Sequence, residues 1–173
     1  MPLLPRLSAI FALVLTMLTP CAALADPATI YLVRHGEKEA VGQDPALTAQ
    51  GRQRAQNIAV MLHKAGIAHI FSTPTARTRQ TAQPLAERGK LEVQLYDPRA
   101  PQALVAKVKG LSGPVLVVGH SNTLSELVRL FGGQPGAEIA DNEYDRVYQL
   151  TPGANGSVGT VVFTSLPETG AAP

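Results

Sequence analysis

Hydrophobic residues alternate between two spacings along most of the chain. Short apolar runs rich in β-branched residues predict buried strands, and they lie at residues 28–33, 68–73, 91–96 and 114–119. Between these runs, apolar residues recur at the spacing of one helix face. The predicted helices span residues 48–66, 75–89, 101–111 and 122–132.

The order of these segments predicts the fold class. Alternating strands and helices favour a mostly parallel sheet covered by helices on both faces. From Tyr144 onward the pattern indicates two further strands joined by a turn rich in Gly and Asn. We therefore expect a three-layer α/β/α fold, with a mostly parallel sheet and one antiparallel edge strand. Pro84 is expected to bend or break the helix that contains it.

The first 25 residues have the composition of a secretory signal peptide. One cation, Arg6, precedes an uncharged stretch over residues 7–18, and Ala23-Leu24-Ala25 forms an A-x-A site. The uncharged stretch is shorter than the about 20 residues that span a bilayer. We expect cleavage after Ala25, with export to the periplasm or beyond and no stable membrane insertion. An uncleaved anchor and lipidation of Cys21 remain alternatives.

The expected domain organisation follows from these segments. Residues 1–25 are the signal peptide, residues 26–165 form one domain, and the small, polar, Pro-rich residues 166–173 form a flexible tail.

Composition narrows the chemistry that the mature protein can perform. Cys21 is the one cysteine, so cleavage after Ala25 excludes disulfides, thiolate catalysis and cysteine-ligated metal sites. The chain has 15 Lys+Arg against 13 Asp+Glu, no Trp and no basic run. These features give no case for binding nucleic acid or an acidic membrane surface. The sequence does not indicate an oligomeric state.

Arginine and histidine side chains that could bind or attack a substrate follow three of the predicted strands. Arg34 and His35 follow the first strand, Arg77 lies just beyond the second, and His120 follows the most apolar strand. In open α/β sheets ligands bind at the carboxyl ends of the strands, so these four side chains are expected to converge. Arginine forks match phosphoryl oxygens, and a histidine nitrogen can attack phosphorus. This combination favours phosphoryl transfer.

Four motifs in order resemble those of the histidine phosphatase superfamily, which has the phosphoglycerate mutase-like fold. They are LVRHGE, LTAQGRQRA, STPTARTRQTA and VVGHSNT, and the similarity runs from about residue 28 to residue 131.

The resemblance implies a role for each matching residue. His35 would be the nucleophile that becomes phosphohistidine, and Arg34 and Arg77 would clamp the phosphate. His120 would be the second histidine of the site, and the backbone N–H of Asn122 would donate to the phosphate oxygens. No cofactor and no metal are implied.

Many members also use a carboxylic acid to protonate the leaving oxygen. Asp97 lies at the spacing from Arg77 where such an acid usually occurs, and it is the favoured candidate. Glu37 and Asp141 are competitors, and some small members that act on phosphohistidine need no dedicated acid.

Short connections after Glu37 and after Arg77 predict an open site, because the mutases carry longer inserts that cover their substrate. We therefore expect a metal-independent phosphomonoesterase of the histidine acid phosphatase type rather than a mutase. Its substrate would be a small phosphomonoester or a phosphorylated protein.

Three other functions fit part of the pattern. GHSNT is one residue short of the G-x-S-x-G elbow of serine hydrolases, with Ser121 as nucleophile, but Thr123 replaces the last Gly and no histidine follows residue 120. His35-Gly36-Glu37 resembles the H-x-E motif of zinc deaminases without its cysteine pair. A module that binds phosphate esters without turnover is the non-enzymatic alternative.

Overall fold

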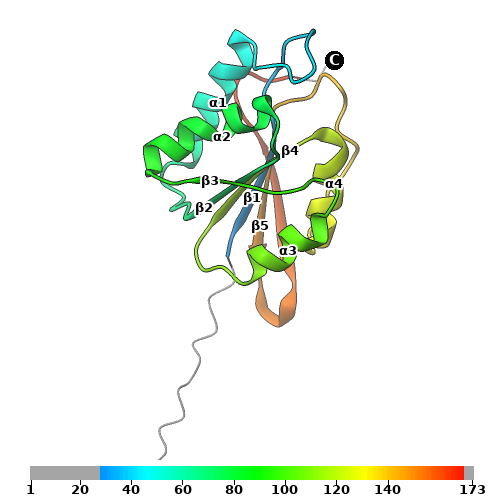
Figure 1. Cartoon of the computed structure of the whole chain (residues 1–173). Coiled ribbons are helices and arrows are strands. Elements are labelled where there is room, and N and C mark those ends of the chain that lie inside the picture. Colours follow the sequence, from blue (N-terminus) through cyan, green and yellow to red (C-terminus); the bar gives the residue numbers. More distant parts are fainter. Residues whose placement is uncertain (1–27, 170–173) are drawn as a thin grey trace, which may run out of the picture.

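The computed structural model of the chain describes residues 28–169, in which six strands form one sheet flanked by helices (Figure 1). In chain order the elements are β1 (Ile30–Arg34), α1 (Ala49–Leu62), β2 (His69–Ser72), α2 (Ala76–Gly89), β3 (Val93–Leu95), α3 (Pro101–Lys109), β4 (Val115–Gly119), α4 (Ser121–Leu130), β5 (Arg146–Pro152), the 3-10 turn η1 (Ala154–Gly156) and β6 (Val158–Thr164). The strand order is β3-β2-β4-β1-β5-β6.

The chain reverses its direction across the sheet between β3 and β4. It moves outward from β1 to β2 and β3, which pair in parallel, and then returns to β4, which lies between β2 and β1. Because crossovers between parallel strands are right-handed, the helices of the outward and the return path cover opposite faces. Accordingly α1 and α2 pack on one face, and α3 and α4 pack on the other. The chain therefore leaves the adjacent ends of β1 and β4 toward opposite faces, and ligands of open α/β sheets bind at such a point.

The last two strands form a hairpin beside β1. β5 pairs antiparallel with β1, and β6 pairs antiparallel with β5. The α/β fold with a mostly parallel sheet is thus confirmed, but the antiparallel strand is not at the edge. Because the two strands of a hairpin run in opposite directions, β6 takes the edge and runs in the direction of β1.

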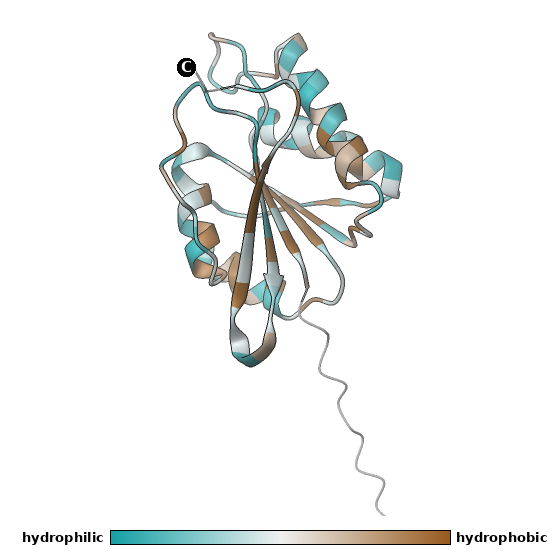
Figure 2. Cartoon of the chain, turned by 180° about the vertical axis from the view of Figure 1, so that it is seen from behind, coloured by the Kyte–Doolittle hydropathy of each residue, from teal (hydrophilic) through white to brown (hydrophobic). Residues whose placement is uncertain are grey.

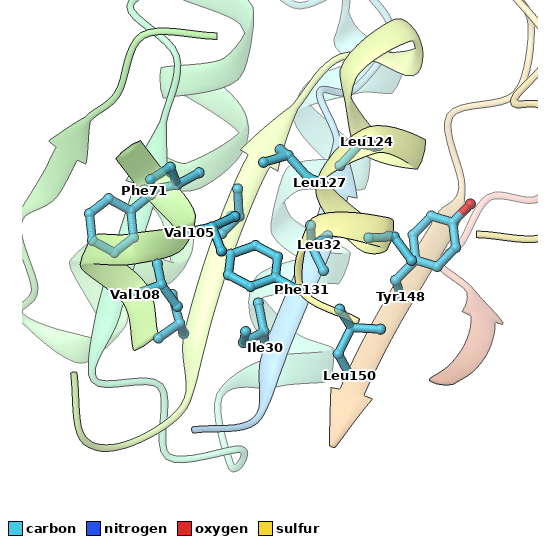
Figure 3. Packing of buried hydrophobic residues seen from close by; sticks show 14 of the residues in the cluster. Ile30, Leu32, Phe71, Val105, Val108, Leu124, Leu127, Phe131, Tyr148 and Leu150 are labelled. Atoms are coloured by element: carbon cyan, nitrogen blue, oxygen red, sulfur yellow. The ribbon is translucent and has the colours of Figure 1, made fainter. Parts of the chain in front are cut away.

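Hydrophobic side chains fill both faces of the sheet. Successive residues of a strand point to opposite faces, so Leu32 joins the cluster under α3 and α4, and Val33 joins the cluster under α1 and α2. Figure 3 shows Leu32 close to Leu127 and Phe131 of the first cluster. Figure 2 shows apolar residues along the central strands, whereas the helices carry both polar and apolar residues. Every residue of β4 is buried, as expected for a strand covered on both faces.

Pro84 lies inside α2 without ending it. A proline removes one intrahelical hydrogen bond, yet the helix continues to Gly89 because the following Leu85 and Ala86 are buried against the sheet. Of the two predicted effects of Pro84, bending or breaking this helix, the break does not occur.

The chain after β6 returns to the body of the domain. Asn57 Nδ2 donates to the carbonyl of Leu166 at 2.8 Å, and the backbone N–H of Thr169 donates to the carboxylate of Asp145 at 2.8 Å. Residues 166–169 thus make specific contacts where a flexible tail was expected. The proposed signal peptide lies outside the described residues. Over residues 28–169, no helix combines the length and apolar character needed to cross a membrane.

Candidate active site

β1 and β4 lie side by side, and a histidine follows each of them. The backbone N–H of His35 donates to the carbonyl of Gly119 at 3.0 Å, which ties the two strand ends together. His120 follows Gly119 and caps the N-terminus of α4. The ring centroids of the two histidines lie 5.3 Å apart, with one ring edge toward the other.

Hydrogen bonds fix the orientation of both rings. Nδ1 of His35 lies 2.7 Å from the carbonyl oxygen of Gly36. Because a carbonyl only accepts, this nitrogen carries the proton, and Nε2 keeps its lone pair. Nε2 of His120 lies 2.9 Å from the hydroxyl of Thr73, which follows β2.

Burial keeps both imidazoles neutral near pH 7. His35 is only 3% exposed. Its burial, together with the nearby His120, Arg34 and Arg77, lowers its pKa from 6.5 to about 3. Burial and the two arginines lower the pKa of His120 from 6.5 to about 4. A neutral His35 has a lone pair available for attack on an electrophile.

Arg34 is held by the loop that precedes β5. Its side chain is buried, and its Nη1 donates to the carbonyls of Ala140 at 2.9 Å and Glu143 at 2.7 Å. The ring of Tyr144 covers the guanidinium, with its centroid 4.0 Å from Cζ. The same ring lies 6.0 Å from the ring of His35. The loop therefore determines where Arg34 points.

Arg77 lies in the first turn of α2, and Asp44 lies beside it. The carboxylate of Asp44 accepts from the backbone N–H of Ala76 at 2.9 and 3.0 Å and lies 3.6 Å from Nη1 of Arg77. Asp44 thus caps the helix that carries Arg77.

Two buried side-chain nitrogens have no hydrogen-bond partner in the part of the chain that the structure describes. They are Nε of Arg34 and Nε of Arg77. Buried donors are normally satisfied, and these two belong to the arginines whose charges act on both histidines. The arrangement suits an anion with several acceptor oxygens.

Glu37 is occupied by a structural contact. Its carboxylate accepts two hydrogen bonds from the buried Arg54, at 2.6 and 2.9 Å. Burial is the largest single effect and raises the pKa of Glu37, but the hydrogen bonds to its carboxylate and the positive charge of Arg54 together leave the pKa below its ordinary value. Glu37 is therefore not suited to donate a proton.

Gly36 and Gly51 allow the segment after His35 to pack against α1. A Cβ at Gly36 would lie 2.7 Å from the carbonyl oxygen of Gly51, and one at Gly51 would lie 2.1 Å from that of Glu37. The N–H of Gly36 donates to the hydroxyl of Thr81 in α2 at 3.0 Å. The short R-H-G segment is thus fixed from both helices of that face.

Asp97 does not join the histidines and arginines. It follows β3, an edge strand that β2 and β4 separate from β1, and its carboxylate pairs with the exposed Arg99 at 3.0 Å. Hydrogen bonds from Arg99 lower the pKa of Asp97, whereas a proton donor needs a raised one. The sequence spacing pointed to Asp97, but the strand order places it away from His35.

Asp141 lies near the site. Its negative charge raises the pKa of Arg34, against the larger lowering of that pKa by burial. Asp141 is exposed and also lines a polar groove of about 440 Å³ that begins at the N-terminus of α4. The groove is lined by Ser121, Asn122, Ser125, Glu126, Arg129, Gly136, Glu138, Ile139 and Asp141.

The first turn of α4 borders both the histidines and this groove. Ser121 and Asn122 are its first two residues, and the first N–H groups of a helix have no intrahelical partner. The N–H of Asn122 is therefore available as a donor. His120 directs Nε2 to Thr73 rather than to Ser121, which gives no support to a serine nucleophile.

Several site residues were not identified from the sequence. Tyr144, Thr81 and Arg54 each reach the segment over residues 34–37 from distant parts of the chain. One signal in the sequence could have indicated the contact between Glu37 and Arg54. These two residues have opposite charges and lie in the first two of the four motifs, LVRHGE and LTAQGRQRA.

The comparisons with known proteins agree with this site. A model of the histidine phosphatase superfamily (branch 1) matches residues 30–100. The "Probable phosphoglycerate mutase GpmB" of Serratia proteamaculans is 44% identical over 77 residues, which cover 40% of this chain. The match spans only 35% of that mutase, about a third of its length.

Solved structures share the fold at low sequence identity. Phosphoserine phosphatase from Entamoeba histolytica, in complex with 3-phosphoglyceric acid, is 18% identical with a TM-score of 0.61 and covers 81% of this chain and 98% of its own. The protein histidine phosphatase SixA complexed with tungstate is 18% identical with a TM-score of 0.60, covering 79% of this chain and 96% of its own.

The fold and the site define an α/β protein with two histidines and two arginines at the switch point of its sheet. The match of the superfamily model to residues 30–100 and the similarity to the mutase support an assignment to the histidine phosphatase superfamily. Within residues 28–169, no three His, Cys, Asp or Glu side chains gather as a metal-binding group.

Proposed function

We propose that the protein is a phosphomonoester hydrolase that works through a phosphohistidine on His35. The observation that carries this proposal is the buried His35 and the half-buried His120, both neutral near pH 7, beside Arg34 and Arg77. The Nε atoms of these two arginines have no hydrogen-bond partner among residues 28–169. The SixA structure with tungstate supports it, because tungstate, like phosphate, is an oxyanion.

In the first step, Arg34 and Arg77 hold the phosphoryl oxygens and neutralise their charge. Nε2 of His35 attacks phosphorus, a P–N bond forms, and the bond to the leaving oxygen breaks. The ring of His35 becomes positively charged, and its Nδ1–H on the carbonyl of Gly36 stabilises that charge. A neutral imidazole keeps one ring N–H, and we propose that His120 uses it to donate to the transferred oxygens.

The leaving alkoxide needs a proton, and we assign the donor to Asp141. Glu37 is paired with Arg54, and Glu143 is paired with Arg146. Among the salt bridges of the described residues Asp141 takes no part, and it lies near Arg34. We propose that this unpaired carboxyl binds a proton from water before it protonates the leaving oxygen. The resulting carboxylate then takes a proton from water in the second step.

In the second step, water attacks the phosphohistidine, the P–N bond breaks, and inorganic phosphate leaves. We favour hydrolysis over mutase chemistry because the connection over residues 38–47 is short and mostly exposed, which gives water access. A mutase must instead retain its phosphoryl group until a second alcohol binds.

The polar groove beside α4 offers space for the leaving alcohol. Glu126, Glu138 and Asp141 line it against one cation, Arg129. This balance favours an uncharged or cationic alcohol over a sugar acid. Both a small phosphomonoester and a phosphorylated protein segment fit an open groove.

We also propose that the protein is exported, as the first 25 residues suggest. N-terminal sequencing of the protein from a periplasmic fraction tests this. A start at Asp26 supports export with cleavage, and an intact Met1 contradicts it.

The function is tested by turnover of the mature chain over a panel of phosphomonoesters without added metal. Release of inorganic phosphate supports the proposal. Interconversion of 2- and 3-phosphoglycerate without phosphate release would instead identify a mutase. Saturable binding of vanadate with no turnover on any ester would identify a binding module.

A further inference from the structure

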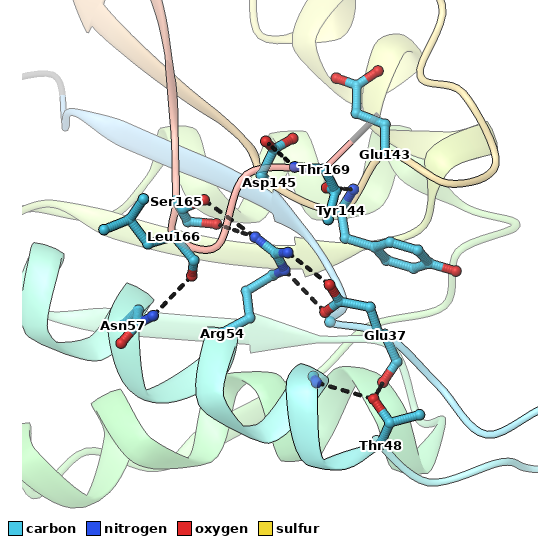
Figure 4. Close-up of polar contacts among 12 residues, drawn as sticks. Glu37, Thr48, Arg54, Asn57, Glu143, Tyr144, Asp145, Ser165, Leu166 and Thr169 are labelled. Atoms are coloured by element: carbon cyan, nitrogen blue, oxygen red, sulfur yellow. Dashed lines mark hydrogen bonds and ion pairs between the residues drawn. The ribbon is translucent and has the colours of Figure 1, made fainter. Parts of the chain in front are cut away.

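The segment over residues 165–169, here called the C-terminal strap, contacts two segments that border the candidate active site. Figure 4 shows it between α1 and the start of β5, with contacts toward both. The backbone N–H of Ser165 donates to the carbonyl of Asp145 at 2.7 Å, which anchors the strap where β6 ends.

One contact reaches the segment after His35 through Arg54. The guanidinium of Arg54 is fully buried, and its Nη1 donates to the carbonyl and the hydroxyl of Ser165 at 3.2 and 3.0 Å. Its Nε and Nη2 hold the carboxylate of Glu37. Arg54 thus connects the strap to a residue two positions from the proposed nucleophile.

The other contact reaches Arg34 through Tyr144. The hydroxyl of Thr169 accepts from the backbone N–H of Tyr144 at 2.9 Å, and the N–H of Thr169 donates to the buried carboxylate of Asp145 at 2.8 Å. These bonds fix the backbone of the residue whose ring covers the guanidinium of Arg34 and lies beside the ring of His35.

The strap contributes little to the hydrophobic core. Leu166 is 63% exposed, and Glu168 is exposed as well. Burial of apolar surface is the main source of folding stability, so the strap's hydrogen bonds matter more for local geometry than for the fold.

We propose that Arg54 and Thr169 are positioning residues, through which the C-terminal strap fixes Arg34 and His35 for phosphoryl transfer. This inference rests on the proposed function of the same site. Arg54 orients the R-H-G segment through Glu37, and Thr169 orients Tyr144 over Arg34. Small displacements of reacting groups reduce rates strongly, because the barrier depends on near-attack geometry.

The proposal is tested by Thr169→Val, which keeps the shape and removes the acceptor, and by a chain that ends at Ser165. Both variants are expected to lower kcat on p-nitrophenyl phosphate by about tenfold, with the melting temperature within a few degrees of the parent protein. Thr169→Ser retains the hydroxyl and is expected to restore kcat. Thr164→Val, on the exposed end of β6, is the matched control and is expected to change nothing.

A second measurement does not depend on turnover. The imidazole of His35, followed by NMR during a pH titration, is expected to titrate closer to 6.5 in both strap variants, because Tyr144 no longer shields it. A parent-like titration and kcat in a folded chain ending at Ser165 would overturn the role of Thr169, and the same result in a folded Arg54→Lys variant would overturn the role of Arg54. If the parent protein turns over no ester, the proposed function fails, while the titration still tests the strap.

Discussion

The two ends of the central sheet have grooves of similar size but opposite character. A polar groove of about 440 Å³ begins at the first turn of α4, directly after His120 at the carboxyl end of β4. At the other end, a groove of about 390 Å³ is lined mainly by apolar residues such as Ile30, Phe131 and Val158. Groove size alone therefore does not locate the chemistry. Strand direction does, because the parallel strands β1 and β4 deliver their following residues to the same end.

Replacing a histidine at each end gives the largest expected contrast. His35→Ala removes the proposed nucleophile and should lower kcat roughly ten-thousandfold or more. His69→Ala, at the start of β2 on the opposite end, should leave kcat unchanged. Steady-state phosphate release measures both. Equal kcat for His35→Ala and the parent protein would show that the histidine pair is not the reaction centre.

Replacing an arginine by lysine separates charge from shape. Arg77→Lys keeps the positive charge but loses the planar guanidinium that can bind two phosphoryl oxygens at once. We therefore expect kcat/KM to fall by roughly a few hundredfold. Arg79→Lys, two residues along the same helix and exposed, is the matched control and should have no effect. A similar loss in both variants would indicate a general effect on α2.

Two aspartates test the proton donor. Asp141→Asn should lower kcat by about a hundredfold on alkyl phosphates, whose leaving groups need a proton, and much less on p-nitrophenyl phosphate. Asp97→Asn should change neither, because that carboxylate pairs with Arg99 at the far edge of the sheet. A selective loss in Asp97→Asn would restore the assignment based on sequence spacing.

The smallest expected effect is on stability in mild acid. The pKa values of His35 and His120, about 3 and about 4 in the folded protein, lie below the 6.5 of the unfolded chain. Between these pKa values the unfolded state binds more protons than the folded state. The two histidines therefore make their full contribution to the free energy of unfolding above pH 6.5, and this contribution falls as the pH decreases toward 4. Urea unfolding at pH 7 and pH 5 measures the loss. His35→Gln should reduce the pH dependence, and an unchanged slope would contradict the burial of a neutral ring.

Much of the fold could be predicted because burial leaves a local pattern. β4 is apolar at every position and covered on both faces, and α1 shows its buried face in Ala55, Ile58 and Leu62. The place of the antiparallel strand was missed, because pairing partners are not encoded within a strand. The break at Pro84 does not occur, because the buried residues that follow it hold the helix together.

The site divides in the same way. Arg34, His35 and His120 could be placed together, since they directly follow strands whose direction was predictable. Asp97 could not be placed, because its distance from His35 depends on the order of the strands. The contacts of Tyr144 and Thr169 join residues far apart in the sequence and become visible only in the folded chain.

The most direct test of the account is to trap the phosphorylated enzyme. Brief reaction of the mature chain with a 32P-labelled phosphomonoester, followed by quenching in base and peptide mapping, should place a base-stable, acid-labile label on His35. The label should be absent from His35→Ala and present in His69→Ala. Label on a serine or a carboxylate, or on the peptide that carries His120 alone, would contradict the proposed mechanism.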